Sequence, residues 1–168
     1  MSLIDLEDYE EKAIVIDPDG DVGEHIELHG LLVVLPKKPA KKDILFHDKP
    51  KSMQMWERIP MPEELRRIRS MDEWYDKPKE FRDRFSPYIE QEFERRRKGV
   101  WFYNNGEPTY ITGRHYMFLQ WSKIDIGYPS YLSFQREIFL HMAACEADPR
   151  CIGQLYTKCR RSGYTNVC

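Results

Sequence analysis

Two runs of aromatic and β-branched residues flank a short turn sequence, and this arrangement constrains the fold more than any other feature of the chain. The runs are Val100–Tyr103 and Thr109–Ile111, and Asn104–Pro108 between them contains an Asn-Gly pair. Asn-Gly tolerates the positive φ angles of a tight turn, while aromatic and β-branched side chains favour strands. The sequence therefore predicts a β-hairpin over residues 100–111.

Two helices are expected before this hairpin. Pro62–Arg69 has a proline and acidic residues at its start and arginines at its end, which matches the helix dipole. Ser86 and Pro87 have the residue types of an N-cap and a first helical position, so they predict the start of a second helix. That helix is expected to end in Arg95–Lys98 and to stop at Gly99.

Two more helices are expected after the hairpin. Thr112 is a suitable N-cap for the first, and Ser133 for the second, which runs to about Asp148. The first should bury Tyr116, Met117, Leu119 and Trp121. The second should bury Phe134, Ile138, Phe139, Met142 and Ala143. Hairpin and helices together predict an α+β module from about residue 61.

The N-terminal region has a different character. Residues 1–12 form an acidic leader with one lysine, and Ala13–Ile16 and His25–Leu35 are predicted strands joined through the turn-rich Asp17–Asp21. Pro36–Lys42 contains four lysines and two prolines, which favours an exposed linker over a contact with DNA phosphate.

Composition narrows the possible classes of protein. The 168 residues are 41% hydrophobic, which permits a packed core and argues against a chain disordered throughout. The formal net charge of -2 argues against a globally basic nucleic-acid coat protein. No apolar run approaches the roughly 18 residues of a membrane span, and the first residues lack the features of a secretory signal. A cytosolic protein is expected.

The cysteines do not indicate a metal site. Cys145, Cys151, Cys159 and Cys168 all lie near the C-terminal end, and none is separated by the two-residue gap of a zinc knuckle. Free thiols are therefore expected. The close pair His25 and His29 lies in strand-like sequence, so exposed strand histidines are favoured over a ligand pair.

The most informative segment for chemistry is a predicted strand, Ile152–Thr157, followed by a loop of the form Lys-x-x-Arg-x-Gly-x-Thr over 158–165. A phosphate-binding loop has the frame Gly-x4-Gly-Lys-Ser/Thr. Gly163 permits the tight turn, Thr165 supplies a hydroxyl for Mg²⁺, and Lys158 can reach the phosphates from the other end of the loop with Arg161 as a second cation. On spacing alone, a basic loop after an edge strand is favoured over a phosphate-binding loop.

The loop Lys158–Thr165 resembles the deviant Walker A loop of the large terminase subunits of tailed bacteriophages, in which the lysine is likewise displaced and a tyrosine follows the glycine. Tyr131–Ile138 resembles the adenine-recognition motif that precedes Walker A in these ATPases. The amide of Gln135 can pair with the N6 donor and N7 acceptor of adenine, and Tyr131 or Phe134 can pack on the purine. The alternative for Gln135 alone is an exposed helix residue.

The resemblance implies a fold and a set of roles. The α+β N-terminal region would lead into the first strand and phosphate loop of a P-loop (ASCE-type) α/β ATPase core. Residues 1–42 would form the leader, β region and linker, 43–130 a helical and hairpin module, and 131–168 the start of the ATPase domain. The residues implied for ATP phosphate binding are Lys158, Arg161, Ser162, Gly163, Tyr164 and Thr165, with Thr165 also on Mg²⁺.

The resemblance also implies what the whole protein does. ATP hydrolysis would drive double-stranded DNA into the procapsid in the host cytoplasm, with a C-terminal endonuclease. Its partners would be the portal protein and the small terminase subunit, and the motor would form a homo-oligomeric ring.

Two departures from the family pattern limit this interpretation. Tyr164 replaces the usual lysine, so weak nucleotide affinity is expected. The sequence ends three residues after Thr165, without Walker B acids, so we expect either a piece of a longer protein or a natural truncation, inactive by itself. A non-enzymatic phage structural or interaction domain, or another P-loop ATPase, remain alternatives.

Overall fold

The computed structural model describes residues 26–28, 31–33, 38–124, 127–147 and 153. The chain divides into two compact units. One consists of residues 41–131, and the other combines residues 1–40 with 132–168. The predicted phosphate loop, the strand predicted at 13–16 and the paired histidines His25 and His29 lie outside the described residues. The strand predicted at 152–157 also lies outside them, apart from Gly153.

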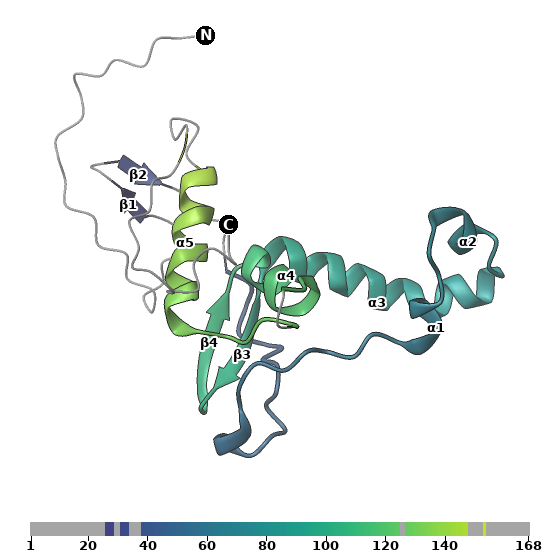
Figure 1. Ribbon diagram of the computed structural model, residues 1–168, viewed down its shortest axis with the longest axis horizontal. Helices are drawn as coiled ribbons and strands as arrows, with labels where there is room; N and C mark the ends of the chain where they lie inside the picture. The colour runs from purple at the N-terminus through teal and green to yellow at the C-terminus, as the bar shows by residue number, and fades with distance from the viewer. Residues whose placement is uncertain (1–25, 29–30, 34–37, 125–126, 148–152, 154–168) are drawn as a thin grey trace, which may run out of the picture. The chain divides into compact units, whose positions relative to one another are not determined.

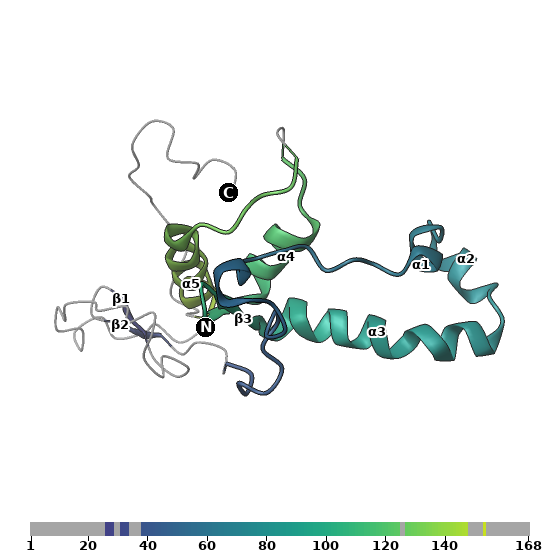
Figure 2. The ribbon, with the colours of Figure 1, turned by 90° about the horizontal axis from the view of Figure 1, so that it is seen from below.

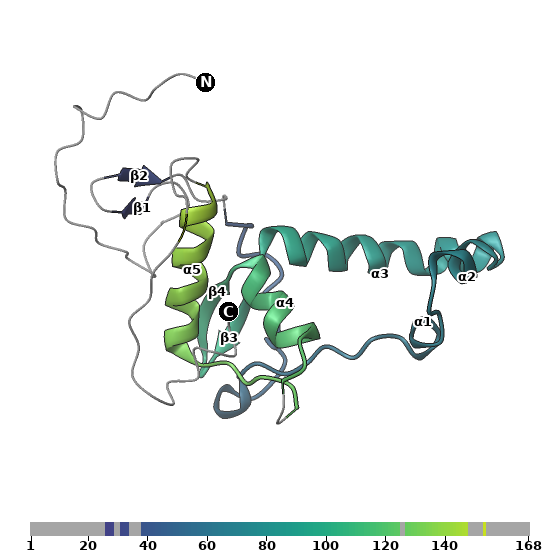
Figure 3. The same cartoon turned by 45° about the horizontal axis from the view of Figure 1, so that its top comes forward.

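The unit of residues 41–131 is built around one long helix and one hairpin (Figure 1). Its elements are η2 (Lys51–Met53), α1 (Glu63–Arg66), α2 (Met71–Tyr75), α3 (Lys79–Lys98), β3 (Val100–Asn104), β4 (Glu107–Ile111) and α4 (Gly113–Trp121). Figure 2 shows α3 running away from the hairpin, with α1 and α2 at its N-terminal end. Figure 3 shows α4 following β4 and lying beside the C-terminal part of α3.

The predicted hairpin is confirmed. β3 and β4 are antiparallel, with Val100 opposite Ile111 and Asn104 opposite Glu107. Asn105 and Gly106 at the turn both have positive φ, 53° and 87°, as a two-residue hairpin turn requires. A short segment at Leu45 adds to the outer edge of β3, because its N–H and C=O bond to the backbone of β3 at 2.9 and 3.1 Å.

The start predicted for the long helix is wrong, and its end is confirmed. α3 begins at Lys79, seven residues before Ser86, and contains Pro87 in its interior. Instead of capping a helix, the Ser86 hydroxyl donates to the Arg82 carbonyl at 2.8 Å. Gly99 ends the helix with φ +76°, and its N–H bonds to the Arg95 carbonyl. An interior proline removes one helical hydrogen bond and crowds the carbonyl one turn earlier, at a cost of about 3 kcal/mol, which a helix of 20 residues with tertiary support tolerates.

The helix predicted over 62–69 ends early, at Arg66, and a second short helix follows that the prediction missed. Ser70 caps this helix, α2, by accepting from the Glu73 N–H at 3.1 Å. The Glu73 carboxylate in turn accepts from the Arg69 N–H at 2.8 Å. Ser-x-x-Glu is the sequence signature of a capping box and was the available signal, although Glu73 here accepts from the N–H of the residue before the cap.

The Thr112 cap of α4 is confirmed, because its hydroxyl accepts from the His115 N–H at 3.3 Å. Tyr116 and Leu119 are fully buried as predicted, but Met117 is 42% exposed. Met117 lies one turn after the exposed Arg114, on the outer stripe of the helix. The buried core of the unit gathers around Phe102, with Trp56 edge-on to both Phe102 and Tyr116.

The other unit contains β1 (Ile26–Leu28), β2 (Leu31–Val33) and α5 (Ser133–Ala147). β1 and β2 are antiparallel with Leu28 opposite Leu31, so the single strand predicted over 25–35 is wrong. Gly30 was the turn signal within that sequence. α5 lies beside β2 and begins at Ser133 itself. None of the helices in the described ranges is long and apolar enough to cross a membrane.

Candidate functional site

Gln135, the predicted adenine-reading residue, lies in the first turn of α5 and is only 4% exposed. The alternative of an exposed helix residue is therefore wrong. Its backbone N–H bonds to the Leu132 carbonyl at 3.0 Å, while its side-chain Oε1 has no hydrogen-bond partner among the described residues. A buried polar atom without a partner costs about 1–3 kcal/mol, so a movement of the Gln135 side chain that gave its enclosed Oε1 a partner would be favourable.

The two aromatic candidates beside Gln135 differ in their surroundings. Phe134 is 40% exposed on α5, so the prediction that it faces the core is wrong and its ring is open to a stacking partner. Tyr131 belongs to the unit of residues 41–131, where its ring stacks on His115 at 5.5 Å and meets Phe102 edge-on at 5.1 Å. Stacking of adenine on either ring stays a prediction.

The predicted phosphate and Mg²⁺ residues, Lys158 to Thr165, lie outside the described residues, and their grouping stays a prediction. Within the described part of the chain, no cluster of three or more His, Cys, Asp and Glu side chains is arranged to hold a metal ion. Cys145 is buried, and its Sγ lies 3.9 Å from Nδ1 of His141 on the preceding helical turn. Cys151, Cys159 and Cys168 are not among the described residues.

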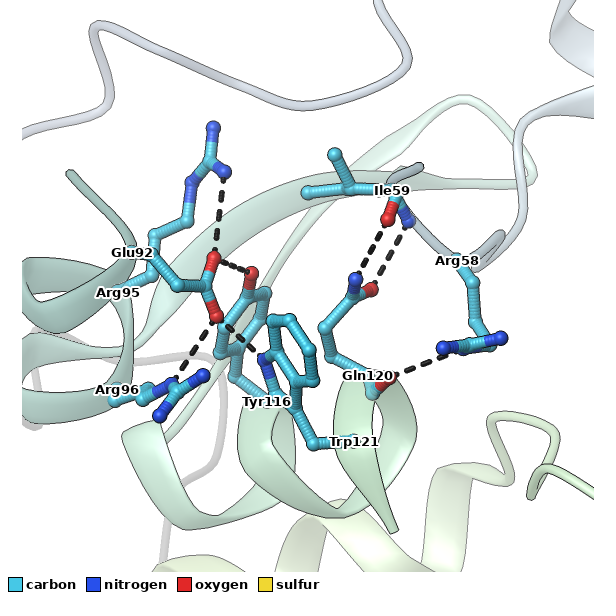
Figure 4. Close-up of polar contacts among 8 residues, drawn as sticks. All are labelled: Arg58, Ile59, Glu92, Arg95, Arg96, Tyr116, Gln120 and Trp121. Carbon is cyan, nitrogen blue, oxygen red and sulfur yellow. Dashed lines mark hydrogen bonds and ion pairs between the residues drawn. The ribbon is translucent and has the colours of Figure 1, made fainter. Parts of the chain in front are cut away.

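A buried carboxylate on α3, which the sequence analysis missed, organises the unit of residues 41–131 (Figure 4). Glu92 is 6% exposed and accepts hydrogen bonds from the Tyr116 hydroxyl at 2.6 Å and the Trp121 indole at 2.5 Å, both on α4. Arg96 donates to it at 3.2 Å, and Arg95 forms an ion pair at 3.7 Å. The signal in the sequence was a glutamate three and four residues before two arginines.

The environment of Glu92 keeps Tyr116 protonated. Burial, and then the hydrogen bond to Glu92 and its negative charge, raise the pKa of Tyr116 well above its usual value. The folded protein therefore keeps this phenol as a hydrogen-bond donor at alkaline pH values where an ordinary tyrosine loses its proton. Because four donors surround Glu92, its oxygens are occupied within the protein, and we assign this cluster a structural role in joining α3 to α4.

A second polar cluster attaches the segment before α1 to the end of α4 (Figure 4). The buried Gln120 side-chain amide donates to the Ile59 carbonyl at 2.7 Å and accepts from the Ile59 N–H at 3.0 Å. It thus satisfies both backbone groups of Ile59, as a neighbouring β-strand would. Arg58 donates to the Gln120 carbonyl at 3.0 Å, and its guanidinium lies 3.4 Å from the centre of the Tyr128 ring. The loop that leads toward α5 is thus held at Tyr128.

Comparison of the chain with protein-family models, with curated proteins and with solved structures finds no match. The function must therefore be argued from the residues themselves. Among the predicted site residues that the structure describes, Gln135 is the one with an unsatisfied buried group. The Glu92 and Gln120 clusters use their hydrogen-bonding groups internally and leave no comparable acceptor.

Proposed function

We propose that the chain is the N-terminal part of the large terminase subunit of a tailed bacteriophage and that it binds ATP. The observation that carries the proposal is the order of two motifs in the sequence. A glutamine-containing motif at Tyr131–Ile138 is followed by a strand-like run and then by the displaced-lysine loop Lys158–Thr165. The buried Gln135 amide with an unpartnered oxygen supports the first of these motifs.

The chemistry of Gln135 gives the proposed site a preference for adenine. Its Oε1 would accept from the N6 amino group, and its Nε2 would donate to N7. Guanine presents an acceptor at O6 in place of that donor, so it would leave the Gln135 oxygen unpaired. Phe134 supplies an exposed aromatic face on the same helical turn. Because the Gln135 Oε1 is enclosed in this structure, the side chain would have to turn outward to pair with adenine, and that pairing would remove the cost of the unpaired oxygen.

The phosphate part of the proposed site rests on the sequence. Lys158 and Arg161 would hold the β- and γ-phosphates, while Ser162, Gly163 and Tyr164 would present backbone N–H groups to them. Thr165 would hold Mg²⁺ through its hydroxyl. When bound, Mg²⁺ neutralises phosphate charge during phosphoryl transfer. The segment from Cys151 to Cys168 contains no acidic residue, and this favours binding of an anion.

In the whole protein, ATP turnover would move double-stranded viral DNA into the procapsid, and a downstream nuclease would cut the DNA. The portal protein, the small terminase subunit and further copies of the large subunit in a ring are the partners that go with this role. The acids that hold the metal and position water would lie downstream of residue 168 in a longer protein.

The test is binding of a non-hydrolysable ATP analogue with Mg²⁺ to a chain extended through the downstream ATPase core. We expect Lys158→Ala to weaken binding about tenfold or more, and Lys123→Ala, which alters an exposed lysine in the other unit, to leave it unchanged. Gln135→Ala should reduce the preference for ATP over GTP, with the exposed Gln91→Ala as its control.

Two results would contradict the proposal. If the extended protein binds no nucleotide, or if Lys158→Ala binds as well as the unaltered protein, then the phosphate-loop assignment fails. A non-enzymatic interaction domain would then be the better interpretation. If Lys158→Ala weakens binding but Gln135→Ala leaves the base preference unchanged, the phosphate loop stands and the adenine assignment fails.

A further inference from the structure

The unit of residues 41–131 has an apolar groove that the proposed ATP site does not use. It lies between α1 and α2 on one side and the second half of α3 on the other. Its volume is about 460 Å³, and its principal apolar lining residues are Leu65, Ile68, Met71, Trp74, Ile89 and Phe93. We refer to it as the α1–α3 groove.

Large side chains at the α1–α3 groove are open to solvent. Phe93 is 63% exposed and Met71 is 62% exposed, although each lines an apolar surface. Trp74 is half-buried beside them. Large apolar groups gathered in one concave patch mark interaction sites, whereas single exposed apolar residues are common on any protein surface.

Two of the three charged residues that line the α1–α3 groove are arginines. Arg69 and Arg96 line it, and Arg66 is the last residue of α1, directly after the lining residue Leu65. The side chains of Arg66 and Arg69 have no ion-pair partner among the described residues. The acidic lining residue is Glu92, whose oxygens are taken up by Tyr116, Trp121, Arg95 and Arg96.

We propose that the α1–α3 groove binds an amphipathic helix of a partner protein, with apolar side chains on one stripe and carboxylates along its flank. An apolar groove between helices accepts such a stripe through residues spaced three or four apart. Methionines such as Met61 and Met71 adapt to the shape of the inserted side chains. The guanidinium groups of Arg66 and Arg69 would pair with the flanking carboxylates.

This inference does not depend on ATP binding, because none of its residues belongs to the proposed nucleotide site. A small polar ligand is a poor candidate because the groove is open and mostly apolar, with few converging hydrogen-bonding groups. The apolar lining favours an occupant with an apolar stripe, and the arginines Arg66 and Arg69 favour one that carries carboxylates.

The test uses the full chain and two designed helical peptides of about 18 residues, five turns, with the same leucine stripe. One peptide carries glutamates on its flanks and the other carries lysines, and binding is followed by fluorescence anisotropy. We expect the glutamate peptide to bind at least tenfold more tightly than the lysine peptide. Arg69→Glu should reduce or reverse that preference.

Variants at two exposed apolar positions locate the binding surface. Phe93→Ser should weaken binding of the glutamate peptide at least tenfold. Tyr75→Ser alters an equally exposed residue on α2 outside the groove lining and should have no effect. Because both side chains are more than half exposed, both variants should unfold at the temperature of the unaltered chain in circular dichroism.

Three results would overturn the proposal. The first is that the glutamate peptide does not bind. The second is that the two peptides bind equally tightly, which would make the groove a non-specific apolar surface. The third is self-association of the chain, seen by analytical ultracentrifugation, that Phe93→Ser abolishes. In that case the groove is covered by a second copy of the chain.

Discussion

The carboxylate of Glu92 accepts a 2.6 Å hydrogen bond from the hydroxyl of Tyr116, and this contact joins α3 to α4 between residues 24 positions apart in the sequence. Both residues are buried, and Arg95, Arg96 and Trp121 complete the surroundings of the carboxylate. Two arginines and two neutral donors thus share one buried negative charge. The stability of the unit of residues 41–131 should depend on that charge.

Replacing Glu92 by alanine should destabilise the chain by about 3–5 kcal/mol, because it removes one member of a buried ion pair and leaves the remaining charges uncompensated. Urea unfolding followed by tryptophan fluorescence measures the free-energy change. Glu94→Ala is the matched control, since Glu94 is on the same helix and pairs with Arg97 and Lys98 at the exposed surface. Equal effects of the two substitutions would contradict the assignment.

Tyr116→Phe keeps the ring and removes the hydrogen bond to Glu92, so it should cost about 1.5–3 kcal/mol at neutral pH. The change in the free energy of unfolding caused by Tyr116→Phe should also depend on pH, and this dependence is the more specific test. Because the pKa of Tyr116 is raised in the folded state above its usual value of 10.0, folded Tyr116 keeps its proton when the unfolded chain loses it. Its contribution to stability is complete below pH 10 and falls as the pH rises further.

The unaltered chain should therefore lose stability above pH 10 more steeply than Tyr116→Phe, by up to about 1.4 kcal/mol per pH unit. Denaturant unfolding at a series of alkaline pH values measures the difference in slope. Tyr103→Phe, at a partly exposed strand position, serves as the control and should keep the slope of the unaltered chain. The same slope for all three proteins would show that the Tyr116 proton is not linked to folding.

Gly99→Ala should destabilise the chain by more than about 1–2 kcal/mol, the usual cost of a left-handed conformation for a residue with a side chain. Gly99 has φ +76°, and a Cβ atom there would lie 2.2 Å from the Ile111 carbonyl oxygen. Thermal unfolding compares this variant with Gly153→Ala, whose added Cβ would meet no atom within 4 Å. A melting temperature unchanged by Gly99→Ala would mean that the turn between α3 and β3 differs from the one described.

Gln120→Ala should release the segment at Ile59, because it removes both hydrogen bonds between that residue and α4. The expected result is faster hydrogen exchange at the Ile59 amide, with exchange in the β3–β4 hairpin unchanged. Gln91→Ala, at an exposed position on α3, should leave exchange at Ile59 as it was. If hydrogen exchange at the Ile59 backbone amide stays slow in Gln120→Ala, then that N–H has an acceptor other than Gln120.

The features that the sequence predicts correctly are those whose cause is local. The Asn105-Gly106 turn, the end of α3 at Gly99 and the Thr112 cap each follow from the preferred backbone angles or hydrogen bonds of a few residues. Ser86 and Pro87 show where this reasoning fails. They have the types of a helix start, but packing along α3 carries the helix through both.

Burial of polar groups was harder to predict. Glu92 and Gln135 are polar residues on helices, for which sequence alone favours exposure, yet both are buried. Their burial depends on elements far away in the sequence, such as α4 in the case of Glu92. Of the candidate site, the type and position of Gln135 were available from the sequence. Its unpaired oxygen required the structure.

The four consecutive cations at the end of α3, Arg95 to Lys98, are less available to DNA than their sequence suggests. Glu92 engages the first two and Glu94 the last two. A protein that grips the DNA backbone displaces condensed counterions in proportion to the phosphates that it neutralises. Arginine and lysine side chains that already form ion pairs with carboxylates displace few counterions. Substitutions in this run should therefore alter the salt dependence of DNA affinity only weakly, and the packaging role proposed above would draw its phosphate contacts from other cations.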